Sequence, residues 1–347
     1  MHIVNIMFSR GAGGIEQAMI DYCEALRLRG HRVTALLYPG AYVEQPLRQH
    51  GVHTITMRNL GEWDYIAAYR LRKCMEELAP DIIIAHANRA YGIARKAISG
   101  SFPLVGITHN YSTSRLTQAD AVFATTHDLI HYVVKQGVPE ERIFHIPNMI
   151  HCNELPHRGD RHDPPIIGAM GRFVAKKGFD IFIDALRILK ERGYEFKAIL
   201  GGSGEEAEKL KKQSKEAGLN GTLSFPGWIQ NKRDFYTHVD IFCLPSLHEP
   251  FGIVLLEAFT YGAPVVASDS EGPRDIITPN YDALMVRKGD AEEMANAIAK
   301  LLQDPQLSFS LAANAFAKTK MKYSIEVVGE RIEQACKVIL GRWKPSR

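Results

Sequence analysis

Hydrophobic positions follow two alternating patterns along the first half of the chain, and their order predicts an α/β fold. Short apolar runs, typical of strands buried on both faces, occupy residues 2–7, 31–37, 52–57, 81–85 and 120–125. Apolar residues at helical spacing lie between them, most clearly at residues 15–30 and 63–78. Strands that alternate with helices indicate a parallel sheet.

A second series of strands and helices begins after residue 165. Its predicted strands lie at residues 166–170, 196–200, 241–244 and 263–268, and its clearest helices at residues 205–217, 290–302 and 324–340. Between the two series, residues 152–165 are polar, rich in Pro and His and without periodicity, which marks a domain junction. The pattern predicts two Rossmann-like domains, at residues 1–155 and 165–323, followed by a last helix within residues 324–347.

Composition indicates a globular protein with two cores. The chain has 347 residues, 46% of them hydrophobic, and a net charge of only +3, which does not favour nucleic acid as a partner. Its five cysteines contain no Cys-x-x-Cys pair, which fits a reducing compartment. The chain starts with a strand, and no apolar run approaches the roughly 18 residues that span a bilayer. We expect a cytoplasmic protein that meets a membrane only from the surface.

The loop and helix after the strand at 241–244 carry the strongest candidate chemistry. Apolar side chains repeat at helical spacing there, so the helix is expected to begin near Pro250, since proline suits a first turn. A glycine lets a ligand approach the amides of Gly252, Ile253 and Val254, which no carbonyl within the helix satisfies. A helix start of this kind attracts phosphate.

Two acids, Glu249 and Glu257, stand on either side of this anion site. A carboxylate would repel a phosphate, but it accepts hydrogen bonds from sugar hydroxyls on either side of one. The pair therefore implies a sugar nucleotide as ligand. The alternative is a helix cap with an unrelated surface Glu.

The run Glu249-Pro250-Phe251-Gly252 with Glu257 resembles the Glu-x7-Glu motif of retaining glycosyltransferases of family 4, whose fold is GT-B. The resemblance covers nearly the whole chain and is stronger after residue 165. It implies two facing Rossmann-like domains, with the acceptor side in the first and a last helix that crosses back to it. It also implies that Glu249 contacts the donor sugar and Glu257 the ribose, with Phe251 between them in the site.

The same resemblance assigns basic and aromatic residues of the second half. Arg172 and Lys177 match the Arg and Lys that hold the donor diphosphate. A charge-assisted hydrogen bond contributes about 1.5 to 3 kcal/mol and a helix end about 0.3 to 1, so these two should dominate phosphate affinity. Gly227 and Trp228 match the segment beside the nucleobase. The alternative for Arg172 and Lys177 is a solvated basic loop, and the alternative for Trp228 is packing on the domain surface.

In the first half, the resemblance places Gly13 and Gly14 opposite the donor and His109 beside the donor sugar. His109 follows a strand, where open parallel sheets place ligands. The alternative for Gly13 and Gly14 is a tight turn without a binding role, and the alternative for His109 is a structural histidine. Asn110 stands where the family often has Asp. A dinucleotide fingerprint is incomplete, because Glu16 replaces its third glycine.

Two further features of the first half have competing explanations. His127 and His131 have the spacing of a zinc helix, but Asp128 replaces the usual Glu and no third ligand follows, so no metal site is expected. The helix at 63–78 mixes aromatic with basic residues, which suits either an anionic membrane surface or a solvated face.

The resemblance implies a metal-independent glycosyltransferase without other cofactors, and the lack of any Asp-x-Asp in the chain agrees with this. It would move a hexose-type sugar from a UDP-sugar, or second a GDP-sugar, to a glycan or lipid-linked acceptor such as lipopolysaccharide, with retention of configuration. Two other classes stay open: an NAD(P)-dependent oxidoreductase that uses the first glycine turn, and a non-catalytic carbohydrate-binding protein. Another GT-B enzyme, such as an epimerase or phosphorylase, fits the motif less well.

Overall fold

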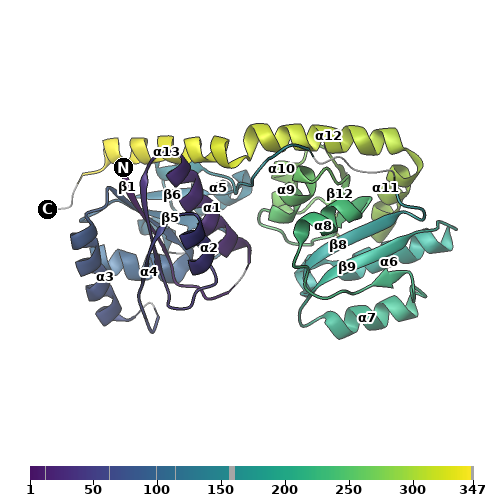
Figure 1. The fold of residues 1–347 in the computed structure, drawn as a ribbon, viewed down its shortest axis with the longest axis horizontal. Coiled ribbons are helices and arrows are strands. Elements are labelled where there is room, and N and C mark those ends of the chain that lie inside the picture. The colour runs from purple at the N-terminus through teal and green to yellow at the C-terminus, as the bar shows by residue number, and fades with distance from the viewer. Residues whose placement is uncertain (12, 62, 99, 114, 156–160, 345–347) are drawn as a thin grey trace. The chain divides into compact units, whose positions relative to one another are not determined.

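A computed structural model describes residues 1–344 except 12, 62, 99, 114 and 156–160. Ala12 of the first glycine turn and residues 156–160 of the predicted junction therefore lie outside the described residues. The chain divides into two compact units, one of Met1–Met149 with Tyr323–Arg347 and one of Ile150–Lys322 (Figure 1).

Within its described residues, the first unit contains a seven-stranded parallel sheet in the order β3-β2-β1-β4-β5-β6-β7. The strands are β1 (His2–Met7), β2 (Arg32–Leu37), β3 (His53–Thr56), β4 (Ile82–His86), β5 (Leu104–Thr108), β6 (Ala121–Ala124) and β7 (Ile143–His145). The helices are α1 (Gly14–Leu28), α2 (Glu44–Gln49), α3 (Tyr65–Leu78), α4 (Ala87–Ile98), α5 (His127–Lys135) and α13 (Ile325–Arg342), with short 3-10 turns at Leu116–Gln118 and Glu140–Arg142.

The sheet of the first unit is covered on both faces. Along β1, Ile3 and Met7 belong to one hydrophobic cluster, whereas Val4 and Ile6 belong to another. Alternate side chains of a strand point to opposite faces, so the two clusters are the two sides of one sheet. This explains why the strand is a continuous apolar run.

The second unit contains a six-stranded parallel sheet among its described residues, in the order β10-β9-β8-β11-β12-β13. Its strands are β8 (Ile166–Arg172), β9 (Lys197–Ser203), β10 (Leu223–Ser224), β11 (Ile241–Leu244), β12 (Val265–Ser268) and β13 (Leu284–Val286). Its helices are α6 (Phe179–Glu191), α7 (Ala207–Glu216), α8 (Lys232–His238), α9 (Ile253–Thr260), α10 (Glu271–Ile276), α11 (Ala291–Gln303) and α12 (Pro305–Lys322), with a 3-10 turn at Ala175–Lys177.

Both sheets reverse their strand order once, between β1 and β4 in the first and between β8 and β11 in the second. This is the doubly wound arrangement, and it confirms the predicted fold class of two Rossmann-like parallel sheets. Ligands of such sheets bind at the carboxyl ends of the strands where the order reverses.

The last helix, α13, packs against α1 of the first unit, as Figure 1 shows. A Cβ added at Gly329 would lie 3.1 Å from that of Ala25, so glycine allows the two helices to approach closely. Arg29 of α1 and Glu333 of α13 form an ion pair across this contact. None of the described helices is both long and apolar enough to cross a bilayer.

Candidate functional site

Two loops of the second unit approach each other where its strand order reverses. One follows β8 and the other follows β11. The amides of Leu247 and His248 donate to the carbonyl of Lys176, at 2.9 and 3.2 Å. Gly178 has φ +63, and a Cβ there would lie 2.2 Å from the carbonyl oxygen of Pro245. Only glycine permits so close an approach of the two backbones.

This contact between the loops places Lys177 beside Glu249, and the two form an ion pair. Glu249 is 8% exposed. A buried carboxylate without a partner is costly, so the lysine compensates for its burial. The pair explains how an acid can lie next to an anion site in the absence of a sugar ligand, since the lysine balances its charge.

The backbone of Glu249 is held on both sides by the segment after β12. Its carbonyl accepts from the amide of Gly272 at 2.7 Å, and its amide donates to Glu271 Oε2 at 3.2 Å. Burial raises the pKa of Glu271, but hydrogen bonds from its own amide, the Glu249 amide and His248, with the charge of Lys288, outweigh this and lower it. Glu271 therefore accepts the Glu249 amide as a carboxylate.

Helix α9 begins at Ile253, so the prediction of a start near Pro250 is wrong. Gly252 has φ +96, in the left-handed region, and the chain becomes helical only after this turn. Among the described residues, no acceptor is found for the amides of Gly252, Ile253 and Val254. The predicted set of free amides is therefore present at the start of α9. Phe251, which precedes this helix, is buried.

Glu257, in the second turn of α9, is 5% exposed and has two partners on α8. Lys232 Nζ donates to its Oε1 at 2.5 Å, and the Tyr236 hydroxyl donates to its Oε2 at 2.9 Å. Burial and the neighbouring Glu257 raise the pKa of Tyr236 well above its usual value, so the hydroxyl remains a donor. Lys232 and Tyr236 were not predicted as site residues, because nothing in their local pattern links them to Glu257.

The other predicted residues of the second unit lie along the same sheet. Arg172 ends β8, and its exposed guanidinium has no partner among the described residues. Gly227 and Trp228 follow β10, two strands away from β8 in the sheet. Trp228 is 53% exposed. The structure thus brings Lys177, Glu249 and the α9 start together, with the tryptophan at the sheet's edge.

In the first unit, His109 follows β5 and stacks on His86, with ring centroids 5.7 Å apart. His86 ends β4, and its Nε2 donates to Asn5 Oδ1 at 3.1 Å. Burial lowers the pKa of His109 to about 4. The pKa of His86 lies well below 6.5, first because this ring is buried and second because a charge on His109 would repel one on His86. Both rings are therefore neutral near pH 7.

Gly14 is the first residue of α1, and Gly13 precedes it in extended conformation. Ser9 donates to Glu16, and a Cβ at Gly13 would lie 3.2 Å from Glu16 Oε2. A carboxylate therefore lies at the helix start, where a dinucleotide site binds pyrophosphate. This disfavours the oxidoreductase alternative for the first glycine turn.

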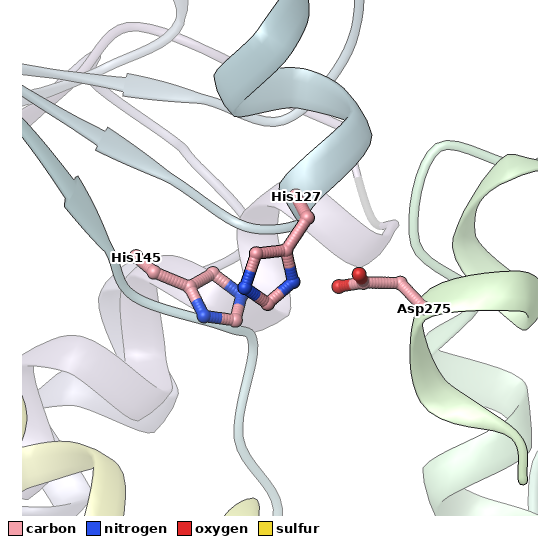
Figure 2. A group of neighbouring side chains, drawn as sticks. All are labelled: His127, His145 and Asp275. Atoms are coloured by element: carbon pink, nitrogen blue, oxygen red, sulfur yellow. The ribbon is translucent and has the colours of Figure 1, made fainter. Parts of the chain in front are cut away.

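Figure 2 shows the rings of His127 of α5 and His145 of β7 next to each other. The ring centroids of His127 and His145 are 4.2 Å apart. Asp275, also drawn in Figure 2, belongs to α10 of the second unit. The ring beside His127 thus comes from another element, β7, and could not be found from helical spacing within α5.

Comparisons with known proteins identify the family and the fold. Residues 12–154 match the family described as Glycosyltransferase Family 4, and residues 154–318 match Glycosyl transferases group 1. Among solved structures, Anabaena Alr3699/HepE in complex with UDP has a TM-score of 0.84 at 22% identity, covering 96% of this chain and 99% of that one.

Two curated relatives match over nearly their whole length. The lipopolysaccharide core biosynthesis glycosyltransferase LpsE of Rhizobium meliloti (strain 1021) is 29% identical over 335 residues, 94% of this chain and 96% of that protein. LpsD of the same organism, described in the same words, is 29% identical over 341 residues, with the same coverage. Two matched family models, which together span residues 12–318, and two doubly wound sheets lead to one conclusion. The chain belongs to the family 4 glycosyltransferases of GT-B fold.

Proposed function

We propose that this glycosyltransferase transfers a hexose-type sugar, with retention of configuration, from a UDP-sugar, or second a GDP-sugar, to a glycan or lipid-linked acceptor of the lipopolysaccharide type. The observation that carries the proposal is the Lys177 and Glu249 ion pair beside the free amides of α9. The names of LpsE and LpsD support the acceptor class. The UDP complex of the structural relative supports the nucleotide.

Positive groups of the second unit would bind the donor diphosphate. Lys177 and Arg172 supply two cations, and the helix start at Gly252 supplies amides. Charge develops on the diphosphate as the bond to the sugar breaks. Groups already aimed at that charge stabilise the transition state without reorganising. In this proposal they supply that stabilisation without a metal ion, so transfer is expected to continue in the presence of a chelator.

The two acids would recognise the two ends of the donor. Glu249 is fixed through its backbone and accepts hydrogen bonds from sugar hydroxyls, so it orients the sugar. Glu257 accepts from the ribose, in competition with Lys232. Gly227 and Trp228 would contact the base. In the first unit, neutral His109 would lie beside the sugar, with Gly13 and Gly14 opposite the donor.

A surface of the first unit supports peripheral contact with the inner face of a membrane. We name it the α3 patch, and its apolar members, each at least 62% exposed, are Leu60, Trp63, Tyr65, Ile66 and Tyr69. Lys96 of α4 lies 4.0 Å from the Trp63 ring centre, and Arg70 is exposed on α3. Aromatic residues beside cations suit the interface of an anionic bilayer.

A thermal-shift screen of the full chain tests the donor. UDP-, GDP- and ADP-sugars and NADH are compared, with and without a chelator. We expect UDP-sugars to raise the unfolding temperature most, because a ligand that binds only the folded state stabilises it. A response to NADH alone would contradict the proposal. Tight UDP-sugar binding without transfer or hydrolysis would instead favour the non-catalytic alternative.

A further inference from the structure

A pocket of about 500 Å³ opens in the first unit, outside the donor residues of the second. It lies at the carboxyl ends of β1 and β4, between which the strand order of this sheet reverses. Residues after β2 and β3 complete its wall. Its size suits one or two sugar units, and its position is where open parallel sheets bind ligands.

The charges of the described residues that line this pocket are unbalanced. Arg10 and Arg89 both line it, and none of the described lining residues is an Asp or a Glu. The Arg10 guanidinium lies over the Tyr38 ring, 4.4 Å from its centre, which limits its movement. Among the described residues, neither arginine pairs with a carboxylate. Arg89 also lies in the first turn of α4, where helix amides favour an anion. Two arginines without acids are suited to a carboxylate or phosphate.

Polar groups in the same wall lack partners. Asn59 is only 5% exposed, and within the described part of the chain neither its Nδ2 nor its Oδ1 has a hydrogen-bond partner. His86 is fully buried, and its Nδ1 is likewise unpaired. Because Nε2 of His86 donates to Asn5, Nδ1 is the acceptor of a neutral ring. A buried amide and ring nitrogen without partners are costly, and sugar hydroxyls would satisfy both.

We propose that this pocket binds the acceptor through an anionic sugar, whose carboxylate or phosphate pairs with Arg10 and Arg89 while Asn59 and His86 bind its hydroxyls. The assignment to the acceptor rests on the proposed function. Leu60, 99% exposed, belongs both to the pocket wall and to the α3 patch. An acceptor with a lipid tail could therefore place its anionic sugar in the pocket while the patch contacts the bilayer.

Binding of small probes to the full chain tests the pocket. The probes are glucose 6-phosphate, glucuronate, inorganic phosphate and neutral glucose, each titrated while protein NMR signals are followed. We expect at least one anionic sugar to bind about tenfold or more tightly than glucose. Binding of glucose 6-phosphate and phosphate would indicate a phosphorylated acceptor, and binding of glucuronate a carboxylated one. Equal binding of neutral and anionic sugars, or no binding of either anionic sugar, would overturn the proposal.

Variants identify the groups responsible. Arg10→Gln and Arg89→Gln are each expected to weaken anionic-sugar binding about tenfold, with glucose unaffected. Arg27→Gln is the matched control, because Arg27 is an exposed arginine of α1 outside the pocket. Unchanged binding in both pocket variants would overturn the proposal. UDP-sugar binding is measured in parallel. If the chain binds an anionic sugar but no UDP-sugar, the proposed function is contradicted, whereas the anion-binding pocket is still supported.

Discussion

Lys177 Nζ donates a hydrogen bond to Glu249 Oε2, although the two residues are 72 positions apart in the chain. The contact exists because the loops after β8 and β11 approach closely at Gly178. In the absence of donor, each charge satisfies the other. In the proposed complex the lysine turns to the diphosphate and the glutamate to the sugar, so neither is left buried without a partner.

Replacing Lys177 by Ala should weaken UDP-sugar binding about tenfold or more. The variant loses a charge-assisted hydrogen bond to the diphosphate, which contributes about 1.5 to 3 kcal/mol. It also leaves the buried Glu249 unpaired near the phosphates. Calorimetric titration of UDP-sugar measures the change. Lys176→Ala is the matched control, because its side chain is exposed on the same turn. Equal losses in the two variants would remove the specific role of Lys177.

Replacing Gly178 by Ala should destabilise the second unit by more than about 3 kcal/mol. The new Cβ would meet the Pro245 carbonyl at 2.2 Å, and φ is +63. Gly193→Ala separates the two causes, since it has φ +82 with no atom within 4 Å of the new Cβ. Gly193→Ala should lower the free energy of unfolding by only about 1 to 2 kcal/mol. Urea denaturation measures both, and equal costs would mean that the close approach of the loops is unimportant.

Stability should fall between pH 6.5 and pH 4 because of His109. Burial lowers the pKa of this ring from 6.5 to about 4. The unfolded chain therefore takes up a proton at the higher pH, and the folded chain only at the lower one. The contribution of neutral His109 to the free energy of unfolding is fully present above pH 6.5, and up to about 3 kcal/mol of it is lost by pH 4.

His109→Asn isolates this contribution from that of the carboxylates. Its urea midpoint should depend less on pH than that of the wild type over this interval. His131→Asn, at an exposed position of α5, serves as control and should leave the slope unchanged. Parallel pH profiles for the wild type and His109→Asn would show that the ring is not buried in solution.

Trp63→Glu and Ile66→Glu should each reduce binding to vesicles that contain anionic lipid. Both side chains are exposed in the α3 patch, 75% and 67% respectively, so the substitutions should not disturb the core. Phe309→Glu, at an equally exposed position of α12, should have no effect. Sedimentation with vesicles measures this. Retention of binding by both patch variants would place any membrane contact elsewhere.

The two sheets could be predicted from sequence because their strands are apolar runs buried on both faces. Helix α12 could not. Its buried positions are mostly small or polar, Ser308, Ala312, Ala315 and Thr319 among them, whereas Phe309 is 67% exposed. A helix that packs through small side chains leaves little hydrophobic pattern.

The candidate site was predictable only in part, for a similar reason. Glu249, Glu257 and the amides at Gly252 form a local motif that a single stretch of sequence contains. Their partners, Lys177 and Lys232, come from other elements and are placed by the fold. The helix start was misplaced because the left-handed turn at Gly252 cannot be recognised from hydrophobic spacing.

In the proposed site, Glu249 orients the donor sugar while other groups bind the nucleotide. Turnover and UDP binding are therefore measured together for Glu249→Ala and the wild type. Turnover should fall by roughly a hundredfold or more, because the sugar loses its orienting contact. The UDP affinity should stay within a few fold, because Lys177, Arg172 and the α9 amides remain. Unchanged turnover in Glu249→Ala would contradict the account.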